Sequence, residues 1–275
     1  MIISNYNYGD YLGGAIQSVL NQTLQNREII VVDDGSTDNS RDVIDRFGQQ
    51  VTPIFNEHRG HSAAVNTGFA ASHGDFVIFL DADDYLTDDA LDRLIEPLVD
   101  NPNVTKSQGY MIAIDGSDTP VGKRIPRNIS PSGDYKRLSL EKGPQACQHA
   151  WSSGIAWTRW FLEAVFPLPE GADRRNDPDG CLSPVATLFG PIVWNRSWRT
   201  NLMAYAVSLM DSSRPSPFYE LVLSPMMSGS TGPLKSIGRV VALTLIRISP
   251  RTLALELARH LLGMPKPPGR DVADN

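Results

Sequence analysis

Short apolar runs alternate with amphipathic helical patterns along the first hundred residues of the chain. Apolar side chains recur at helical spacing over 12–20, and the following run 28–32 is continuous and rich in β-branched residues. Such a run is typical of a strand that is buried on both faces, as in a parallel sheet covered by helices. The same alternation predicts strands at 2–3, 51–55 and 76–80 and helices at 39–47, 63–71 and after Thr87, which is placed to cap the last helix. The pattern therefore predicts an α/β fold with a mostly parallel sheet flanked by helices.

The pattern changes after residue 102. Pro and Gly are frequent up to about residue 145, which we interpret as an extension of the sheet together with loops. Residues 224–233 are rich in Pro, Gly and Ser and predict a linker, and two short helical patterns follow within 234–275. We therefore expect one domain over 1–223, then the linker and a C-terminal helical appendage.

Basic residues are interspersed among apolar ones in the expected appendage, as at Arg239 and Arg247. They interrupt the apolar stretch, which is also shorter than the roughly 20 residues that a membrane-spanning helix needs. The pattern suits peripheral contact with a membrane, packing on the preceding domain or pairing in a homodimer, and does not separate the three. No signal-peptide pattern precedes the first strand, so we expect a cytoplasmic protein, with peripheral contact at the inner face of the membrane as an alternative.

The formal net charge of −6 argues against a nucleic-acid-binding protein, which normally presents a basic face to the phosphate backbone. The chain has two cysteines, Cys147 and Cys181, which are too few for a disulfide framework and lack the spacing of metal ligands. A reducing compartment is the simpler interpretation of this cysteine content.

Three carboxylates, those of Asp81, Asp83 and Asp84, lie within four residues directly after the apolar run 76–80. Neighbouring carboxylates repel one another, so a bound cation would stabilise the cluster. In open α/β sheets ligands bind beyond the carboxyl ends of the strands, and Mg²⁺ or Mn²⁺ joins one or two carboxylates to substrate phosphates. The spacing therefore predicts a site for a divalent cation and a diphosphate. The alternative is an acidic turn that only caps the next helix.

Two other expected strand ends carry polar residues that suit a nucleoside. Asp33 and Asp34 follow the run 28–32, and either carboxylate could accept a hydrogen bond from a base or a ribose. Ser4 and Tyr6 follow the first strand, where the aromatic ring could stack on a base. Each of these two segments, taken alone, is explained at least as well by a turn or a surface loop.

Taken together, the segments resemble the family-two glycosyltransferases, which are inverting enzymes with the GT-A fold. The similarity follows the expected order over 2–7, 18–23, 29–36, 60–68 and 74–84, with weaker matches at 153–154 and 166–170. The resemblance implies that residues 1–100 bind a nucleotide sugar, by default a uridine diphosphate sugar. It also implies that residues 101–223 bind the acceptor, a glycan, a lipid-linked compound or another hydroxyl compound.

The resemblance implies roles for the polar residues at the strand ends. The donor-binding set is Ser4, Tyr6, Asp33, Asp34, Asp81 and Asp83. Within this set, Tyr6 and Asp34 are expected to contact the donor base. Asp81 and Asp83 are expected to form the DXD motif, which touches the ribose, the diphosphate and the Mn²⁺ or Mg²⁺ cofactor.

The resemblance also implies a catalytic aspartate in the second half of the chain, commonly preceded by another acid. The nearest match is the segment 176–180, which offers Asp179 and Asp177 without that acidic pair. We prefer Asp179, because it precedes Gly180, where the related sequences tend to resume a helix after their catalytic acid. The catalytic base would take the proton from the acceptor hydroxyl.

Three weaker alternatives complete the sequence analysis. His58 and His61 have a spacing that suits metal ligands, but no third ligand follows, so solvated loop histidines are the preferred interpretation. A sugar nucleotidyltransferase would carry a Gly-rich phosphate loop after its first strand, and residues 4–8 contain none. A non-catalytic nucleotide-sugar-binding or assembly protein is the alternative from another functional class.

Overall fold

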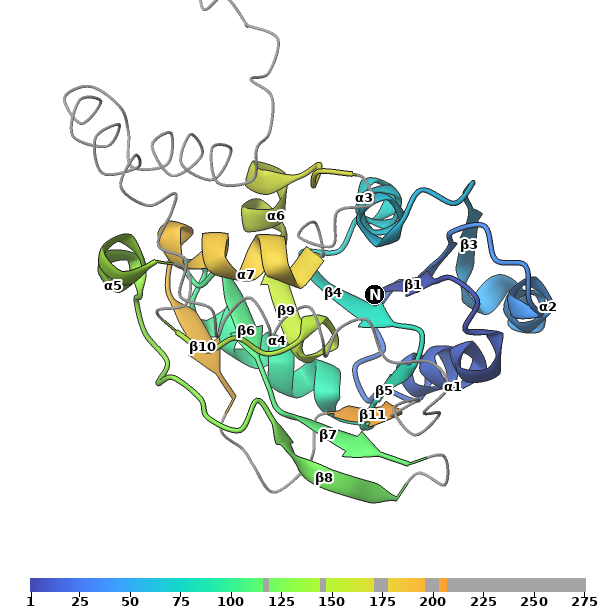
Figure 1. The fold of residues 1–275 in the computed structure, drawn as a ribbon, viewed down its shortest axis with the longest axis horizontal. Coiled ribbons are helices and arrows are strands. Elements are labelled where there is room, and N and C mark those ends of the chain that lie inside the picture. Colours follow the sequence, from blue (N-terminus) through green and yellow to red (C-terminus); the bar gives the residue numbers. More distant parts are fainter. Residues whose placement is uncertain (116–118, 144–146, 171–177, 196–202, 207–275) are drawn as a thin grey trace, which may run out of the picture.

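The computed structural model describes residues 1–115, 119–143, 147–170, 178–195 and 203–206 (Figure 1). Its centre is a seven-stranded sheet in the order β10-β6-β9-β4-β1-β2-β3. The strands are β1 (Ile2–Asn5), β2 (Ile30–Asp33), β3 (Thr52–Phe55), β4 (Phe76–Asp81), β6 (Lys106–Gln108), β9 (Ile155–Thr158) and β10 (Ile192–Trp194). Strands β1 to β4 are parallel to one another and β10 is parallel to β6, whereas β9 runs antiparallel to β4 and β6. The predicted mostly parallel sheet is confirmed.

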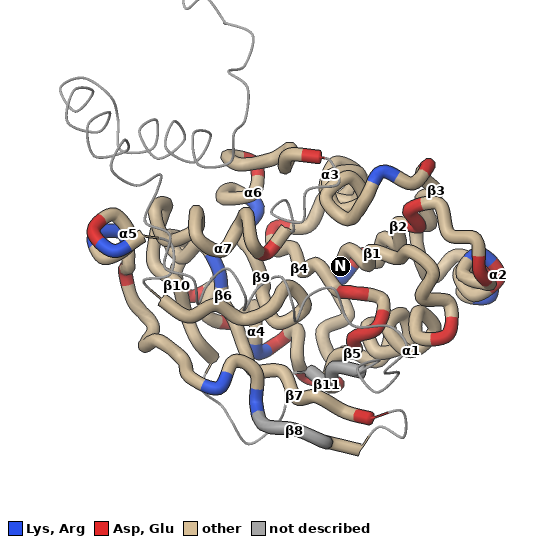
Figure 2. Tube along the Cα trace, in the orientation of Figure 1, with Lys and Arg blue, Asp and Glu red and all other residues tan. Residues whose placement is uncertain are grey.

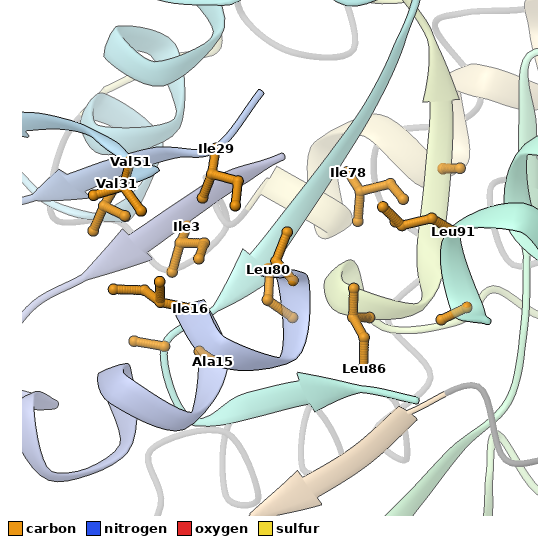
Figure 3. Packing of buried hydrophobic residues seen from close by; sticks show 14 of the residues in the cluster. Ile3, Ala15, Ile16, Ile29, Val31, Val51, Ile78, Leu80, Leu86 and Leu91 are labelled. Carbon is orange, nitrogen blue, oxygen red and sulfur yellow. The ribbon is translucent and has the colours of Figure 1, made fainter. Parts of the chain in front are cut away.

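Helices cover both faces of this sheet, as predicted. One face packs against α1 (Gly9–Leu20), α2 (Ser40–Asp45) and α4 (Ala90–Asp100), and the other against α3 (His61–Ala71), α6 (Arg159–Val165) and α7 (Pro178–Phe189). Successive strand residues alternate between the two cores: Ile3 and Val31 belong to the first, and Ile2 and Ile30 to the second. Figure 3 shows Ile3 and Val31 beside Ile16 of α1 in the first core. The apolar runs are continuous because both of their faces are buried.

A second sheet of four strands, in the order β5-β11-β7-β8, lies below the central sheet near α1 (Figure 1). Its strands are β5 (Asp84–Leu86), β7 (Met111–Ile114), β8 (Pro120–Ile125) and β11 (Met203–Ala206). The short helix α5 (Lys136–Lys142) packs on α7, and two 3-10 turns are η1 (Gly48–Gln50) and η3 (Ser152–Gly154). The second sheet joins residues that lie far apart in the sequence, since β11 pairs with both β5 and β7.

The elements predicted up to residue 80 are confirmed, although α2 is shorter than the helix predicted at 39–47. One prediction is wrong: the helix expected after a Thr87 cap begins instead at Ala90, with Asp89 as its N-terminal cap residue. The physical reason is that the carbonyl oxygens of Thr87 and Asp88 accept hydrogen bonds from Nε2 of Gln22 and the backbone amide of Thr23, which hold these residues in a turn against the segment after α1.

The region between residues 102 and 145 contains more regular structure than its Pro and Gly content indicates, because β6, β7 and β8 all fall within it. The strand β6 is the predicted extension of the main sheet. None of the described helices is long and apolar enough to cross a membrane. The predicted linker 224–233 and the appendage 234–275 lie outside the described residues.

Candidate functional site

A cavity of about 340 Å³ lies at the carboxyl ends of β1, β2 and β4. These ends meet at one edge of a parallel sheet, so side chains from distant parts of the chain converge there. Six of the eight residues predicted for the site line the cavity: Ser4, Tyr6, Asp34, Asp81, Asp83 and Asp179. Of the other two, Asp33 is fully buried and Asp177 lies outside the described residues.

The ring of Tyr6 stacks on the imidazole of His58, with centroids 3.9 Å apart and ring planes inclined by 14°. The Nδ1 atom of the same imidazole lies 2.9 Å from Oδ2 of Asp34. These are the two kinds of contact that the sequence predicts for a donor base, a stack on Tyr6 and a hydrogen bond to Asp34. His58 lies in the loop before α3 with its ring half exposed, as the loop interpretation predicts, and its contacts with Tyr6 and Asp34 make it part of the cavity lining.

The buried carboxylate of Asp34 anchors the loop that precedes α3. It accepts hydrogen bonds from the backbone amides of Arg59 at 3.1 Å and Gly60 at 2.7 Å, in addition to its contact with His58. This loop comes so close to the end of β2 that a Cβ atom on Gly35 would lie 2.8 Å from the backbone nitrogen of His58. Gly35 also has a φ of +77°, which favours glycine. The loop and the strand end therefore form one rigid side of the cavity.

Asp33 lies behind the cavity lining. Its carboxylate accepts a hydrogen bond from Nδ2 of Asn5 at 2.8 Å and another from the backbone amide of Ser36 at 3.2 Å. These bonds join the ends of β1 and β2. The geometry therefore gives Asp33 a supporting position rather than a place beside a bound donor.

His61 links the first strand to the acidic residues after β4. Its Nε2 atom is 3.0 Å from Oγ of Ser4 and 3.6 Å from Oδ1 of Asp81. His61 is the first residue of α3 and lines the cavity, so its placement in a loop is wrong. The sequence pattern did not reveal this position because the partners of His61 lie 57 residues before it and 20 residues after it.

The acidic residues after β4 are poorly compensated by the chain itself. Burial raises the pKa of Asp83 to about 6, and the charge of His61 opposes part of that rise. Burial also raises the pKa of Asp84 well above its usual range, and the charges of Asp81 and Asp83 raise it further. The Oδ1 atom of Asp84 has no hydrogen-bond partner within the described part of the chain. The repulsion predicted from the sequence is present in the fold, and a cation nearby would relieve it.

The end of β4 fits a small divalent cation. Within the described ranges, no group of three or more His, Cys, Asp and Glu side chains is arranged to hold a metal ion. Mg²⁺ and Mn²⁺ do not need such a group where a nucleotide binds, since one or two carboxylates, substrate phosphates and water complete their coordination. Asp81 and Asp83 line the cavity and supply the oxygen ligands that these ions prefer. The residues present therefore fit a cation that is shared with a diphosphate.

The second half of the chain contributes Trp151, Ser152 and Asp179 to the same lining. Asp179 lies in the first turn of α7, where the exposed amide groups of a helix favour a negative charge. The helix begins at Pro178, whose fixed φ suits a first helical position. The helix that we expected after Asp179 therefore starts one residue before it.

Trp151 and Ser152 are lining residues that sequence reasoning missed. Neither belongs to a recognisable motif; Trp151 directly precedes η3 and Ser152 is its first residue, shortly before β9. The position of η3 depends on the antiparallel pairing of β9 with β4. A weak signal was the similarity at residues 153–154, because Oγ of Ser153 accepts a hydrogen bond from the backbone amide of Asp81 at 3.0 Å.

The sheet order, the helices on both faces and the acid-rich strand ends are those of a GT-A domain, which confirms the predicted fold class. The chain belongs to glycosyl transferase family 2, whose family model matches residues 1–155. An uncharacterized glycosyltransferase of a Nostoc species is 38% identical over 211 residues, which are 75% of this chain and 64% of the relative. Glycosyltransferase GlyG of Streptococcus pneumoniae is 37% identical over 100 residues, 35% of this chain and 33% of the relative. The chain thus spans less than two thirds of the length of these relatives.

Solved structures share the fold at low sequence identity. Residues 1–349 of TarS of S. aureus, crystallised with UDP, superpose with a TM-score of 0.57 at 19% identity, covering 75% of this chain and 60% of that TarS fragment. Glucosyl-3-phosphoglycerate synthase of Mycobacterium tuberculosis, crystallised with Mn²⁺, UDP and glucosyl-3-phosphoglycerate, superposes with a TM-score of 0.52 at 16% identity. That match covers 96% of this chain and 80% of the synthase.

Proposed function

We propose that this chain transfers a sugar from a nucleoside diphosphate sugar, with uridine as the nucleoside, to an acceptor hydroxyl with inversion at the anomeric carbon. The observation that carries the proposal is the convergence of Tyr6, Asp81, Asp83 and Asp179 on one cavity, although they come from three separate regions of the sequence. Membership of glycosyl transferase family 2 supports the reaction class. The UDP bound to two structural neighbours supports the choice of nucleoside.

On this proposal the first half of the chain holds the donor. The exposed face of Tyr6 stacks on the base, and a base N–H that reaches Asp34 competes with His58 for its carboxylate. Asp81 and Asp83 would hold the divalent cation, Mn²⁺ or Mg²⁺, which would neutralise charge on the diphosphate. Asp33 keeps the ends of β1 and β2 together behind these contacts.

The second half of the chain supplies the base. The Asp179 carboxylate accepts the proton of the acceptor hydroxyl while the hydroxyl oxygen attacks the anomeric carbon. The bond between that carbon and the diphosphate oxygen breaks as the new bond forms, and the nucleoside diphosphate leaves with the electron pair. Attack from the face opposite the leaving group inverts the anomeric configuration. The acceptor is a glycan, a lipid-linked compound or another hydroxyl compound.

The test is an assay of a panel of nucleotide sugars for transfer and for slow donor hydrolysis, with Mn²⁺, with Mg²⁺ and with a chelator. We expect release of UDP from one or a few uridine donors, and only when a divalent cation is present. Asp83→Asn serves as the inactive control on the same fold. Tight donor binding without hydrolysis or transfer to any acceptor would favour the non-catalytic nucleotide-sugar-binding alternative.

A further inference from the structure

A lysine lies fully buried in the main sheet, behind the part of the cavity that the second half of the chain forms. Lys106 is the first residue of β6, and none of its surface is exposed. Lysine is almost never fully buried unless its charge is paired, because removing an ammonium group from water is costly. A buried lysine in a strand therefore requires an explanation from its surroundings.

The contacts of the Lys106 ammonium involve three other parts of the fold. Its Nζ atom lies 3.0 Å from Oγ of Ser183 in α7 and 3.1 Å from Nδ1 of His149, which precedes η3. The same atom lies 5.1 Å from the ring centre of Trp157 in β9, a distance typical of a cation–π contact. An ammonium group has three donors, and these partners lie in three different elements.

Two of the partners of Lys106 lie close in sequence to residues that line the cavity. Ser183 lies four residues after Asp179, which places the two on the same side of α7, one turn apart. His149 lies two residues before Trp151, which lines the cavity with Ser152. Figure 2 shows β6 passing below α7, with a basic position in blue at the strand. Lys106 therefore joins the helix that carries Asp179 to the segment that carries Trp151.

The titratable groups that face Lys106 are His149, Cys147 and Asp179. Burial lowers the pKa of Lys106 to about 7, and the charges of Cys147 and Asp179 oppose that lowering. Burial raises the pKa of the Cys147 thiol, which lies 3.7 Å from Nε2 of His149. Asp179 is thus a negatively charged group close enough to Lys106 to influence its ionisation. The ammonium and the Asp179 carboxylate stabilise each other's charged form.

We propose that Lys106 is a positioning residue for the acceptor side of the site: it fixes the first turns of α7 against the segment 147–152 and places a positive charge behind Asp179. This inference rests on the proposed function, in which Asp179 is the base. Lys106 touches neither donor nor acceptor, so its effect reaches the reaction through Asp179. The donor side of the cavity, formed by β1, β2 and β4, does not depend on it.

The test compares three variants with the wild-type chain. Lys106→Met keeps the length of the side chain and removes its charge, whereas Ser183→Ala removes one hydrogen bond and keeps the charge. Lys142→Met removes a charge from an exposed lysine of α5 and is the matched control. For Lys106→Met we expect the acidic limb of the pH profile of kcat to shift to higher pH by about one unit or more, as when a carboxylate loses a nearby cation. Donor affinity, measured by calorimetry, should stay within about twofold of wild type, and Ser183→Ala and Lys142→Met should keep the wild-type limb.

A second measurement does not need turnover. Carbon NMR of the aspartate carboxyls, with the Asp179 signal assigned from its loss in Asp179→Asn, gives the titration midpoint of this carboxyl directly. We expect the midpoint at higher pH in Lys106→Met than in wild type or Lys142→Met. In wild type the Asp179 signal should also respond near pH 7, together with the Cε signal of Lys106, as the ammonium loses its proton. The wild-type response keeps the test valid if Lys106→Met does not fold.

The outcomes separate the two proposals. A wild-type chain that transfers no sugar would remove the proposed function, and the Asp179 midpoint would still decide whether Lys106 acts on this carboxylate. The inference would be overturned if the Asp179 midpoint were unchanged in Lys106→Met. It would also be overturned if the Asp179 signal in wild type did not change as Lys106 loses its proton. Equal losses of kcat and donor affinity with an unchanged midpoint would show that Lys106 only supports folding, which also overturns it.

Discussion

The two halves of the cavity differ in how the negative charge of their carboxylates is compensated. At the end of β4 the carboxylates of Asp81, Asp83 and Asp84 crowd together, and the pKa of Asp84 is raised partly because of its acidic neighbours. At the start of α7, Asp179 lies one turn before Ser183, whose Oγ atom is 3.0 Å from Nζ of the buried Lys106. Figure 2 shows acidic positions in red between β4 and β5 and a basic position on β6. The proposed cation would compensate the first half, whereas a lysine of the chain itself lies near the second half.

In the proposed mechanism this difference matches two separate roles, cation-dependent donor binding in the first half and proton abstraction in the second. A site that binds an anionic diphosphate through a metal must leave its carboxylates uncompensated until both ligands arrive. A base must be ionised before its substrate binds, so its compensating charge is best built into the fold. The donor half and the acceptor half should therefore respond differently to substitution, pH and removal of metal.

The largest expected effect separates chemistry from binding. Asp179→Asn should lower turnover roughly 10²–10⁴-fold with donor affinity nearly unchanged, because the carboxylate acts on the acceptor in the transition state. Asp177→Asn is the matched control, and steady-state kinetics with calorimetric titration of the donor measure both quantities. Loss of activity in Asp177→Asn with full activity in Asp179→Asn would transfer the role to Asp177, and full activity in both would remove the base from this segment.

The next effect should appear in binding rather than in chemistry. Asp81→Asn and Asp83→Asn should each weaken cation-dependent donor binding by about 10-fold or more, since even groups that only support metal ligands are worth about 10–100-fold. The fold should persist because the changes preserve size. Calorimetry with donor and Mn²⁺, compared with donor and chelator, isolates the cation-dependent part. Unchanged affinity in both variants would contradict the metal site at the end of β4.

Loss of base recognition should have an effect comparable to the loss of a single carboxylate, since a tenfold change in affinity is about 1.4 kcal/mol. Tyr6→Ala should weaken nucleotide binding by about 1–3 kcal/mol, the range for loss of a stack between a base and an aromatic side chain. Tyr6→Phe keeps the ring and should retain most of the affinity. Wild-type affinity in the alanine variant would assign Tyr6 to the stack with His58 alone.

The smallest expected effect concerns stability without ligand. The pKa of Asp83 is raised from 3.8 to about 6, so ionising it costs folding free energy at neutral pH, and this cost disappears as the pH falls from about 6 toward 4. Asp83→Asn should therefore be more stable than wild type at pH 7.5 by on the order of 1 kcal/mol, below the full linkage value of about 1.4 kcal/mol per pKa unit because Asp83 is partly exposed. Thermal unfolding of the metal-free proteins should show this difference shrinking between pH 7 and pH 4. A difference that grows on acidification would contradict the sign.

The strand ends of the first half could be placed from the sequence because their information is local. Each strand from β1 to β4 is an apolar run, and its polar residues follow directly at the strand end, so order along the chain translates into position at one sheet edge. The acceptor half depends on pairings between distant segments, such as β9 between β4 and β6. Trp151 and Lys106 could not be assigned for this reason, because nothing near either residue indicates its partners. The contacts of His58 and His61 could not be predicted for the same reason, since Asp34 and Asp81 meet them only in the fold.

A crystal structure of the wild-type chain with UDP and Mn²⁺ tests the division of the cavity most directly. We expect the uracil against Tyr6, the cation between the diphosphate and the carboxylates of Asp81 and Asp83, and Asp179 facing the diphosphate with no contact to the nucleotide. His58 should give way or remain on the far face of Tyr6. A nucleotide bound elsewhere, or a cation coordinated by Asp179 in place of the residues after β4, would contradict the account.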